Sequence, residues 1–136
     1  MEAMWTRFLP AIAEVKRRVE AGDIGEIKFM QGSFCYADAR RGHAPYPSLA
    51  QSMLYDRGVY LIALAQHLHP GDVVRASTRC LEWDERSLCQ FDLQLDRGVL
   101  LAGVCGNASE LANSFEIVGN RGTIAIPGPF LKAHGF

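Results

Sequence analysis

Two stretches of the chain carry apolar residues at helical spacing. In the first, apolar side chains follow one another at steps of four, three and four, which places them on one helix face; they are Phe8, Ile12, Val15 and Val19. Pro10 suits the first turn of such a helix, where its missing N–H costs nothing. Gly22 suits the position just after the last turn. The pattern predicts a helix that begins near Pro10 and ends at Gly22.

The second stretch predicts a longer helix over residues 49–68. Ser48 and Gln51 form the S-x-x-Q arrangement of a capping box, and Pro70-Gly71 ends the pattern. Its packing face consists of Leu54, Leu61, Ala65 and Leu68. A separate, adjacent stripe consists of Asp56, Tyr60 and His67. The helix therefore has one apolar side and, next to it, a side with titratable groups.

Elsewhere the period of the pattern is two, which indicates β-strands. Six strands are predicted, at residues 26–36, 73–82, 86–95, 99–105, 115–118 and 123–126. Turn signals at Asp96-Arg97-Gly98 and at residues 119–122 join neighbouring strands as hairpins. Residues 37–47 have no periodicity and are predicted to be a loop.

These elements predict an α+β fold, an open and mainly antiparallel β-sheet with two helices on one face. Strands joined by tight turns pair antiparallel, and two helices can cover only one face of the sheet. The strand at 99–105 is apolar on both faces. Its second face needs a partner, so we expect a homodimer that forms through the open face of the sheet.

Composition narrows the class of protein. The 136 residues suit one domain, residues 1–136, and the net charge of −1 without a basic patch argues against a nucleic-acid partner. The longest apolar stretch, residues 59–65, is too short to span a membrane, and no signal peptide is visible. We therefore expect a cytoplasmic protein. The cysteines, none in a C-x-x-C pair, are expected to be buried free thiols; they are Cys35, Cys80, Cys89 and Cys105.

The titratable stripe holds the candidate chemistry. Asp56 and Tyr60 are four residues apart, so they point the same way from a helix, and Gly58 leaves room beside them. An acid and a phenol held together can pass a proton, but they can equally be a hydrogen-bonded pair at the edge of a core. His67 and His69 are two residues apart and face different ways, so we predict no metal site.

Three blocks of sequence, in order, span nearly the whole chain. They are Glu2-Ala3-Met4-Trp5-Thr6-Arg7-Phe8-Leu9-Pro10, Leu49-Ala50-Gln51-Ser52-Met53-Leu54-Tyr55-Asp56-Arg57-Gly58-Val59-Tyr60 and Val118-Gly119-Asn120-Arg121-Gly122-Thr123-Ile124-Ala125-Ile126-Pro127. Together they resemble the Gfo/Idh/MocA oxidoreductases, most closely the dihydrodiol dehydrogenase branch. The second block resembles the start of the family's catalytic helix, except that Arg57 stands in place of an apolar residue.

The resemblance implies roles for individual residues. Tyr60 would move the proton of a substrate hydroxyl as a general acid–base, and Asp56 would orient Tyr60 or relay its proton. Aromatic walls would accept a flat, apolar diol or a sugar face. The substrate-binding residues implied are Trp5, Phe34 and, more loosely, Phe130, with Lys28 as a nearby cation.

The resemblance also implies a nicotinamide cofactor, NAD or NADP, for the full-length family. This sequence has no G-x-G-x-x-G after a strand, so we expect no nucleotide-binding domain and no cofactor in this chain alone. The expected function is the substrate-binding and dimerisation portion of an NAD(P)-dependent oxidoreductase that acts on a diol or sugar-like CH–OH group and is inactive alone. The alternative is a non-catalytic homodimeric α+β module that binds a small ligand or assembles.

Overall fold

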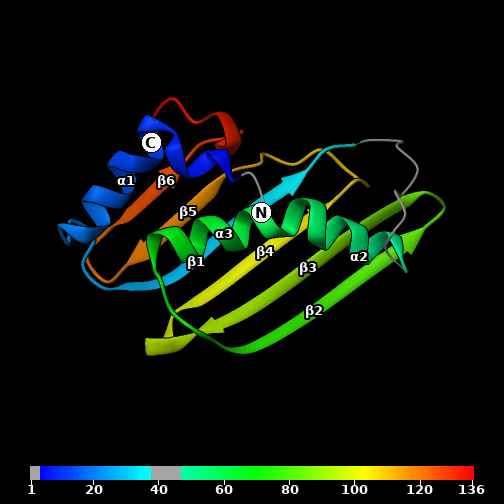
Figure 1. Ribbon diagram of the computed structural model, residues 1–136, viewed down its shortest axis with the longest axis horizontal. Coiled ribbons are helices and arrows are strands. Elements are labelled where there is room, and N and C mark those ends of the chain that lie inside the picture. The colour runs from blue at the N-terminus through cyan, green and yellow to red at the C-terminus, as the bar shows by residue number, and fades with distance from the viewer. Residues whose placement is uncertain (1–3, 38–46) are drawn as a thin grey trace.

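Six strands form one open sheet in the computed structural model, which describes residues 4–37 and 47–136 (Figure 1). The strands are β1 (Ile27–Cys35), β2 (Val73–Trp83), β3 (Arg86–Leu95), β4 (Leu100–Gly106), β5 (Phe115–Gly119) and β6 (Thr123–Ile126). Their spatial order is β2-β3-β4-β1-β5-β6. The predicted α+β fold with a mainly antiparallel sheet is confirmed.

One strand pair is parallel. β1 lies parallel to β4, with Phe34 opposite Cys105, whereas every other neighbouring pair is antiparallel. Parallel strands need a long crossover connection, and the chain between β1 and β4 supplies one that contains the second helical stretch and the β2–β3 hairpin. The tight turns predicted from the sequence indicate only antiparallel neighbours, so they did not predict this parallel pair.

Both helical stretches lie on the same face of the sheet (Figure 1). The first is α1 (Pro10–Glu20). The second consists of α2 (Leu49–Met53), a π-helical turn (Leu54–Gly58) and α3 (Val59–Leu68). The Ser48 side chain accepts a hydrogen bond from the Gln51 N–H at 3.1 Å, as expected of its cap. The predicted single helix is therefore present, but with a wider turn in its middle. Among the described residues, no helix is long and apolar enough to cross a membrane.

Gly22 ends α1 as predicted. Its φ of +76° is in the left-handed region, where glycine is favoured. The Gly22 N–H donates to the Val19 carbonyl at 3.0 Å, and the Asp23 N–H donates to the Arg18 carbonyl at 3.1 Å. These two bonds form a Schellman motif. At the other end, the predicted packing role of Phe8 is wrong, because Phe8 lies in the preceding 3₁₀ turn (Trp5–Phe8) and is 85% exposed.

The core lies between the helices and one face of the sheet. Alternate residues of β3 point into it and are buried, namely Cys89, Phe91, Leu93 and Leu95. They belong to one buried cluster with Ile12 and Val15 of α1 and Leu61 and Leu64 of α3. None of the described helices lies over the opposite face of the sheet (Figure 1), and Leu100 of β4 is half exposed there.

The expectation of four free thiols is wrong for one pair. Cys80 and Cys89 lie directly opposite each other on β2 and β3, with a Cα–Cα distance of 4.2 Å, and form a disulfide. The cross-strand register brought them together, which spacing along the chain did not show. Cys35 and Cys105 are free and buried as expected. Burial raises the pKa of Cys35 to about 11 and that of Cys105 to about 12, so both stay protonated thiols.

Candidate functional site

Four aromatic rings meet near the carboxyl end of β1. The Phe34 ring makes edge-to-face contacts with Tyr60 at 5.5 Å, Tyr36 at 5.6 Å and Phe130 at 5.9 Å between ring centres. Such contacts are the favoured geometry for aromatic pairs, because the positive edge of one ring faces the negative face of the other. Phe34 is therefore the centre of the cluster, and it joins β1 to α3 and to the C-terminal 3₁₀ turn Phe130–Lys132.

The π-helical turn brings the second helical stretch close to the sheet. Gly58, its last residue, is buried, and a Cβ there would lie 3.2 Å from the Cys105 sulfur of β4. Glycine therefore allows the helix to approach β4 at this point. π-Helical turns occur mostly as single-turn bulges, and frequently at functional sites. Here the turn carries Asp56 and precedes Tyr60.

Asp56 lies at the surface of the domain, whereas Tyr60 lies at the edge of its core. The Asp56 side chain is 67% exposed, and Tyr60 is partly buried with its ring against Phe34. At this exposure, the Asp56 side chain is not part of the core. The catalytic roles that the resemblance implies for both residues remain predictions.

Arg57 is buried beside this pair. It is 8% exposed, and its Nη1 donates to the carbonyls of Tyr36, at 3.0 Å, and of Gly106. Its Nε lies 3.6 Å from an Asp56 carboxylate oxygen, and its guanidinium lies 6.0 Å from the centre of the Phe34 ring. The sequence showed only that Arg57 stands in place of an apolar residue. The carbonyls are at strand ends that are far apart in sequence.

The remaining candidate residues fall into two groups. Phe130 is fully buried in the aromatic cluster. Trp5 is 45% exposed in the 3₁₀ turn Trp5–Phe8, which packs against both α3 and the turn that carries Phe130. Lys28 is paired with Glu26 at 2.8 Å, six residues along β1 from Phe34, or about 20 Å at strand spacing. The structure thus brings five of the six candidates to one region and leaves Lys28 apart.

His67 and Glu26, two titratable groups outside the aromatic cluster, have pKa values that are shifted through local burial and charge. Partial burial lowers the pKa of His67, helped by the nearby charges of Lys16 and Arg7. The Lys28 ammonium, by its hydrogen bond, lowers the pKa of Glu26.

Within residues 4–37 and 47–136, no three His, Cys, Asp or Glu side chains are grouped so that they could hold a metal ion.

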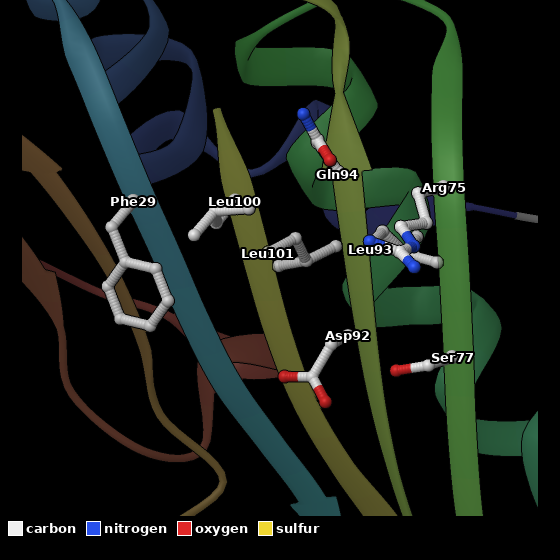
Figure 2. Close-up of a pocket in the computed structure, with 8 residues that line it drawn as sticks. All are labelled: Phe29, Arg75, Ser77, Asp92, Leu93, Gln94, Leu100 and Leu101. Atoms are coloured by element: carbon white, nitrogen blue, oxygen red, sulfur yellow. The ribbon is translucent and has the colours of Figure 1, made fainter. Parts of the chain in front are cut away.

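Two hollows lie on the open face of the sheet. Figure 2 shows the first, of about 420 Å³, where Phe29 and Leu100 of neighbouring strands stand beside Arg75, Ser77 and Asp92. The second, of about 440 Å³, includes Ser33, Gln90 and Val104 in its lining. Side chains alternate across a strand, so Phe29 and Phe34 point to opposite faces of β1. The first hollow is therefore separate from the aromatic cluster.

Comparison with known proteins agrees with this architecture. A model of the GFO/IDH/MocA C-terminal domain matches residues 12–125. Trans-1,2-dihydrobenzene-1,2-diol dehydrogenase from Danio rerio is 32% identical over 130 residues, which cover 93% of this chain and 39% of that enzyme. The enzyme of the same name from Sus scrofa is 26% identical over 132 residues, with 95% and 39% covered. The chain thus spans about two fifths of these relatives.

Solved structures share the fold at lower identity. A dehydrogenase from Chromobacterium violaceum superposes with a TM-score of 0.80 at 15% identity, covering 91% of this chain and 37% of that one. Scyllo-inositol dehydrogenase from Lactobacillus casei, with bound NAD(H) and scyllo-inositol, gives 0.72 at 17% identity, covering 91% and 40%. The family model covers most of the sequence, and the fold agrees with it. This chain therefore belongs to the GFO/IDH/MocA family, as a C-terminal domain.

Proposed function

We propose that this chain is the substrate-binding and dimerisation portion of an NAD(P)-dependent oxidoreductase that acts on a diol or sugar-like CH–OH group. The observation that carries the proposal is the placement of Tyr60, which packs edge-to-face on Phe34 while the next acidic group on its helix, Asp56, is exposed. A partly buried phenol at an aromatic cluster is suited to a flat substrate that carries a hydroxyl.

The proposed step is a proton transfer at the Tyr60 oxygen. When a substrate carbon is oxidised, its hydroxyl proton passes to Tyr60, and in reduction the proton returns. A phenol ionises near pH 10 in water, so a cation beside Tyr60 is needed for this step at neutral pH. Lys28 is held by Glu26 and lies away from the cluster. We expect the cation to come from another part of the assembled enzyme.

The residues of this chain do not fit the dinucleotide itself. A pyrophosphate is held by a glycine-rich turn that leads into a helix. In the described part of the chain, α1 follows Phe8-Leu9 and α2 follows Pro47-Ser48, neither of which is glycine-rich. We therefore assign no cofactor contact to this chain and expect the isolated chain to bind neither NADH nor NADPH with micromolar affinity.

The substrate class follows from the aromatic walls and from the relatives. The similar enzymes are named for a trans-diol of a six-membered ring, and one structural neighbour holds an inositol. Both ligands are cyclic and carry adjacent hydroxyls. Tyr60, held in place by the buried Phe34 ring, can meet a hydroxyl of such a ligand, and the more exposed Trp5 can pack against the face of its ring. We propose a cyclic diol of this size as the ligand.

Saturation-transfer NMR tests the proposal on the isolated chain. Trans-1,2-dihydrobenzene-1,2-diol should show transfer from the protein, and Phe34→Leu should weaken it, because Tyr60 loses the ring that holds it in place. The matched control is Phe8→Leu, which changes an exposed ring outside the cluster. Calorimetric titration with NADH and NADPH should show no binding. Equal diol transfer in Phe34→Leu and wild type, or micromolar NADH binding, contradicts the assignment.

A second candidate function is a non-catalytic homodimeric module. The observation that favours it is the open face of the sheet. On this face Leu81 is more than half exposed and Leu100 is half exposed. This function requires the face but not the aromatic cluster. A chain that dimerises normally, yet shows no diol transfer at any concentration tested, would favour this candidate over the first.

A further inference from the structure

Arg57 is a buried cation that the proposed chemistry does not use. A guanidinium stays protonated at all physiological pH values, and burying such a charge is costly unless it is paired and hydrogen-bonded. Arg57 is buried, and its Nη1 donates to backbone carbonyls inside the protein. Its position is therefore explained by what it holds inside the protein.

Its first partners are the ends of two strands. Nη1 donates to the carbonyls of Tyr36, just after β1, and of Gly106, the last residue of β4. β1 and β4 are the parallel pair, with Cys35 opposite Gly106. Arg57 therefore ties the π-helical turn to both strand ends at the point where the sheet's own hydrogen bonds finish.

Its other sides contact two candidate site residues. The guanidinium lies 6.0 Å from the centre of the Phe34 ring, within the range of a cation–π interaction. Its Nε lies 3.6 Å from the Asp56 carboxylate. Phe34 in turn packs edge-to-face on Tyr60. One side chain therefore touches Phe34 and Asp56 directly and reaches Tyr60 through the Phe34 ring.

We propose that Arg57 is the positioning residue of the candidate site, which sets the orientation of Phe34 and Asp56 and, through Phe34, that of Tyr60. The guanidinium is suited to this because its planar fork donates in fixed directions. The part of the proposal that concerns the ring orientations does not depend on the proposed function. The expected effect on ligand affinity rests on the proposed function. A purely structural role would change stability and leave the rings in place.

The experiment compares Arg57→Met with wild type by NMR of the Phe34 and Tyr60 ring signals, followed by diol titration. Methionine keeps much of the side-chain bulk and removes every donor. The matched control is Arg121→Met, because Arg121 also donates to a backbone carbonyl, that of Gly22, at an exposed position away from the cluster. Arg57→Lys is the second variant, which keeps the charge without the fork and remains available if the methionine variant does not fold.

In Arg57→Met, or in Arg57→Lys if only that variant folds, the Phe34 and Tyr60 ring signals should shift or broaden. Diol affinity should fall about tenfold or more, since a small misplacement of a site costs that much or more. Arg121→Met should change neither. Ring signals that match wild type in a folded Arg57 variant overturn the proposal. If wild type binds no diol, the proposed function fails, and the ring signals still decide the role of Arg57.

Discussion

At the scale of single residues, the members of the aromatic cluster differ in burial and therefore in role. Phe34 and Phe130 are buried and hold the rings together. Tyr60 is partly buried and contributes one ring edge, and no hydrogen bond within the described structure is assigned to its phenol oxygen. The hydroxyl therefore contributes little to folding. A core tyrosine would show the opposite, a buried oxygen with a fixed partner.

Tyr60→Phe should therefore leave stability almost unchanged. Removing a hydroxyl that has no protein partner loses no hydrogen bond and orphans no buried group. A denaturant melt of the isolated chain should show a loss below about 0.5 kcal/mol, compared with about 1 kcal/mol or more for a buried, bonded phenol. The variant should abolish turnover in an assembled enzyme that contains this domain. A loss of stability above 1 kcal/mol would assign Tyr60 to the core instead.

Gly58→Val should be much more harmful than its position in a helix suggests. A Cβ at Gly58 already lies 3.2 Å from the Cys105 sulfur, and the two further methyl groups of valine would enter the same contact. Overpacking of this kind costs about 1–3 kcal/mol. Urea unfolding measures the cost, and Gly135→Val is the control, since nothing lies within 4 Å of a Cβ at Gly135. Equal stability of the two variants would show that the helix can move away from β4.

At the scale of elements, β2 is the weakest part of the sheet. It is an edge strand, and Cys80 is the only one of its residues that is even partly buried. Apart from its ladder to β3, it is held by the Cys80–Cys89 disulfide and by Glu82, whose carboxylate accepts from the Ala50 N–H of α2 at 2.6 Å. Edge strands that bury little apolar surface open easily, so these two links hold β2 against β3 and α2.

Reduction of the disulfide should loosen β2 first. A cross-link closing so short a loop contributes about 2–3 kcal/mol in the chain-entropy account. Cys80→Ser, or a reducing agent, should lower the unfolding free energy by about that amount and speed hydrogen exchange in β2. A reducing agent added to Cys80→Ser should have no further effect. No change in either measurement would show that β2 is held by its ladder alone.

Alkylation of thiols checks the state of all four cysteines. The native chain should react slowly at every site, because Cys35 and Cys105 are buried with raised pKa values and the other pair is bonded. Denaturant without reductant should expose two reactive thiols, and denaturant with reductant should expose four. Mass spectrometry counts the added groups. Four additions without reductant would contradict the disulfide.

At the scale of the whole molecule, the helices leave one face of the sheet uncovered (Figure 1). Leu81 and Leu100 are exposed apolar residues of this face. Leu100 lines one hollow there together with the charged residues Arg75 and Asp92 (Figure 2). A large, partly apolar face on a small domain is typical of an interaction surface. A second copy of the chain, packed sheet to sheet, would cover it.

A homodimer through this face should be seen by sedimentation equilibrium at micromolar concentration. Leu100→Asp should give a monomer, because a charge at the centre of the face would be buried without a partner. Phe8→Asp is the control, since Phe8 is 85% exposed on the helical side and should leave the dimer mass unchanged. A monomeric wild-type chain would contradict the argument that the open face needs a cover.

Local patterns in the sequence were sufficient to predict most elements. The bounds of β3 and β6 agree with the predicted strands, and the Ser48 cap, the Gly22 cap and the helix end before Pro70 are as expected. Each depends on residues within a few positions of one another. Asp56 and Tyr60 are also only four positions apart, and this spacing was sufficient to place them on neighbouring turns.

The amino-acid sequence alone determined which segments are helices and strands and which face of each is apolar, because these follow from spacing of 3.6 and 2 residues. Only the tertiary structure decided the parallel β1–β4 pair, the Cys80–Cys89 bond, the π-helical turn and the partners of Arg57. The bonded or paired groups in the disulfide, the β1–β4 ladder and the Arg57 contacts are separated by 9 to more than 70 positions in the chain. A local pattern cannot predict which of these distant residues meet. Their pairing depends on the register of the sheet, and the register follows from how the whole core packs.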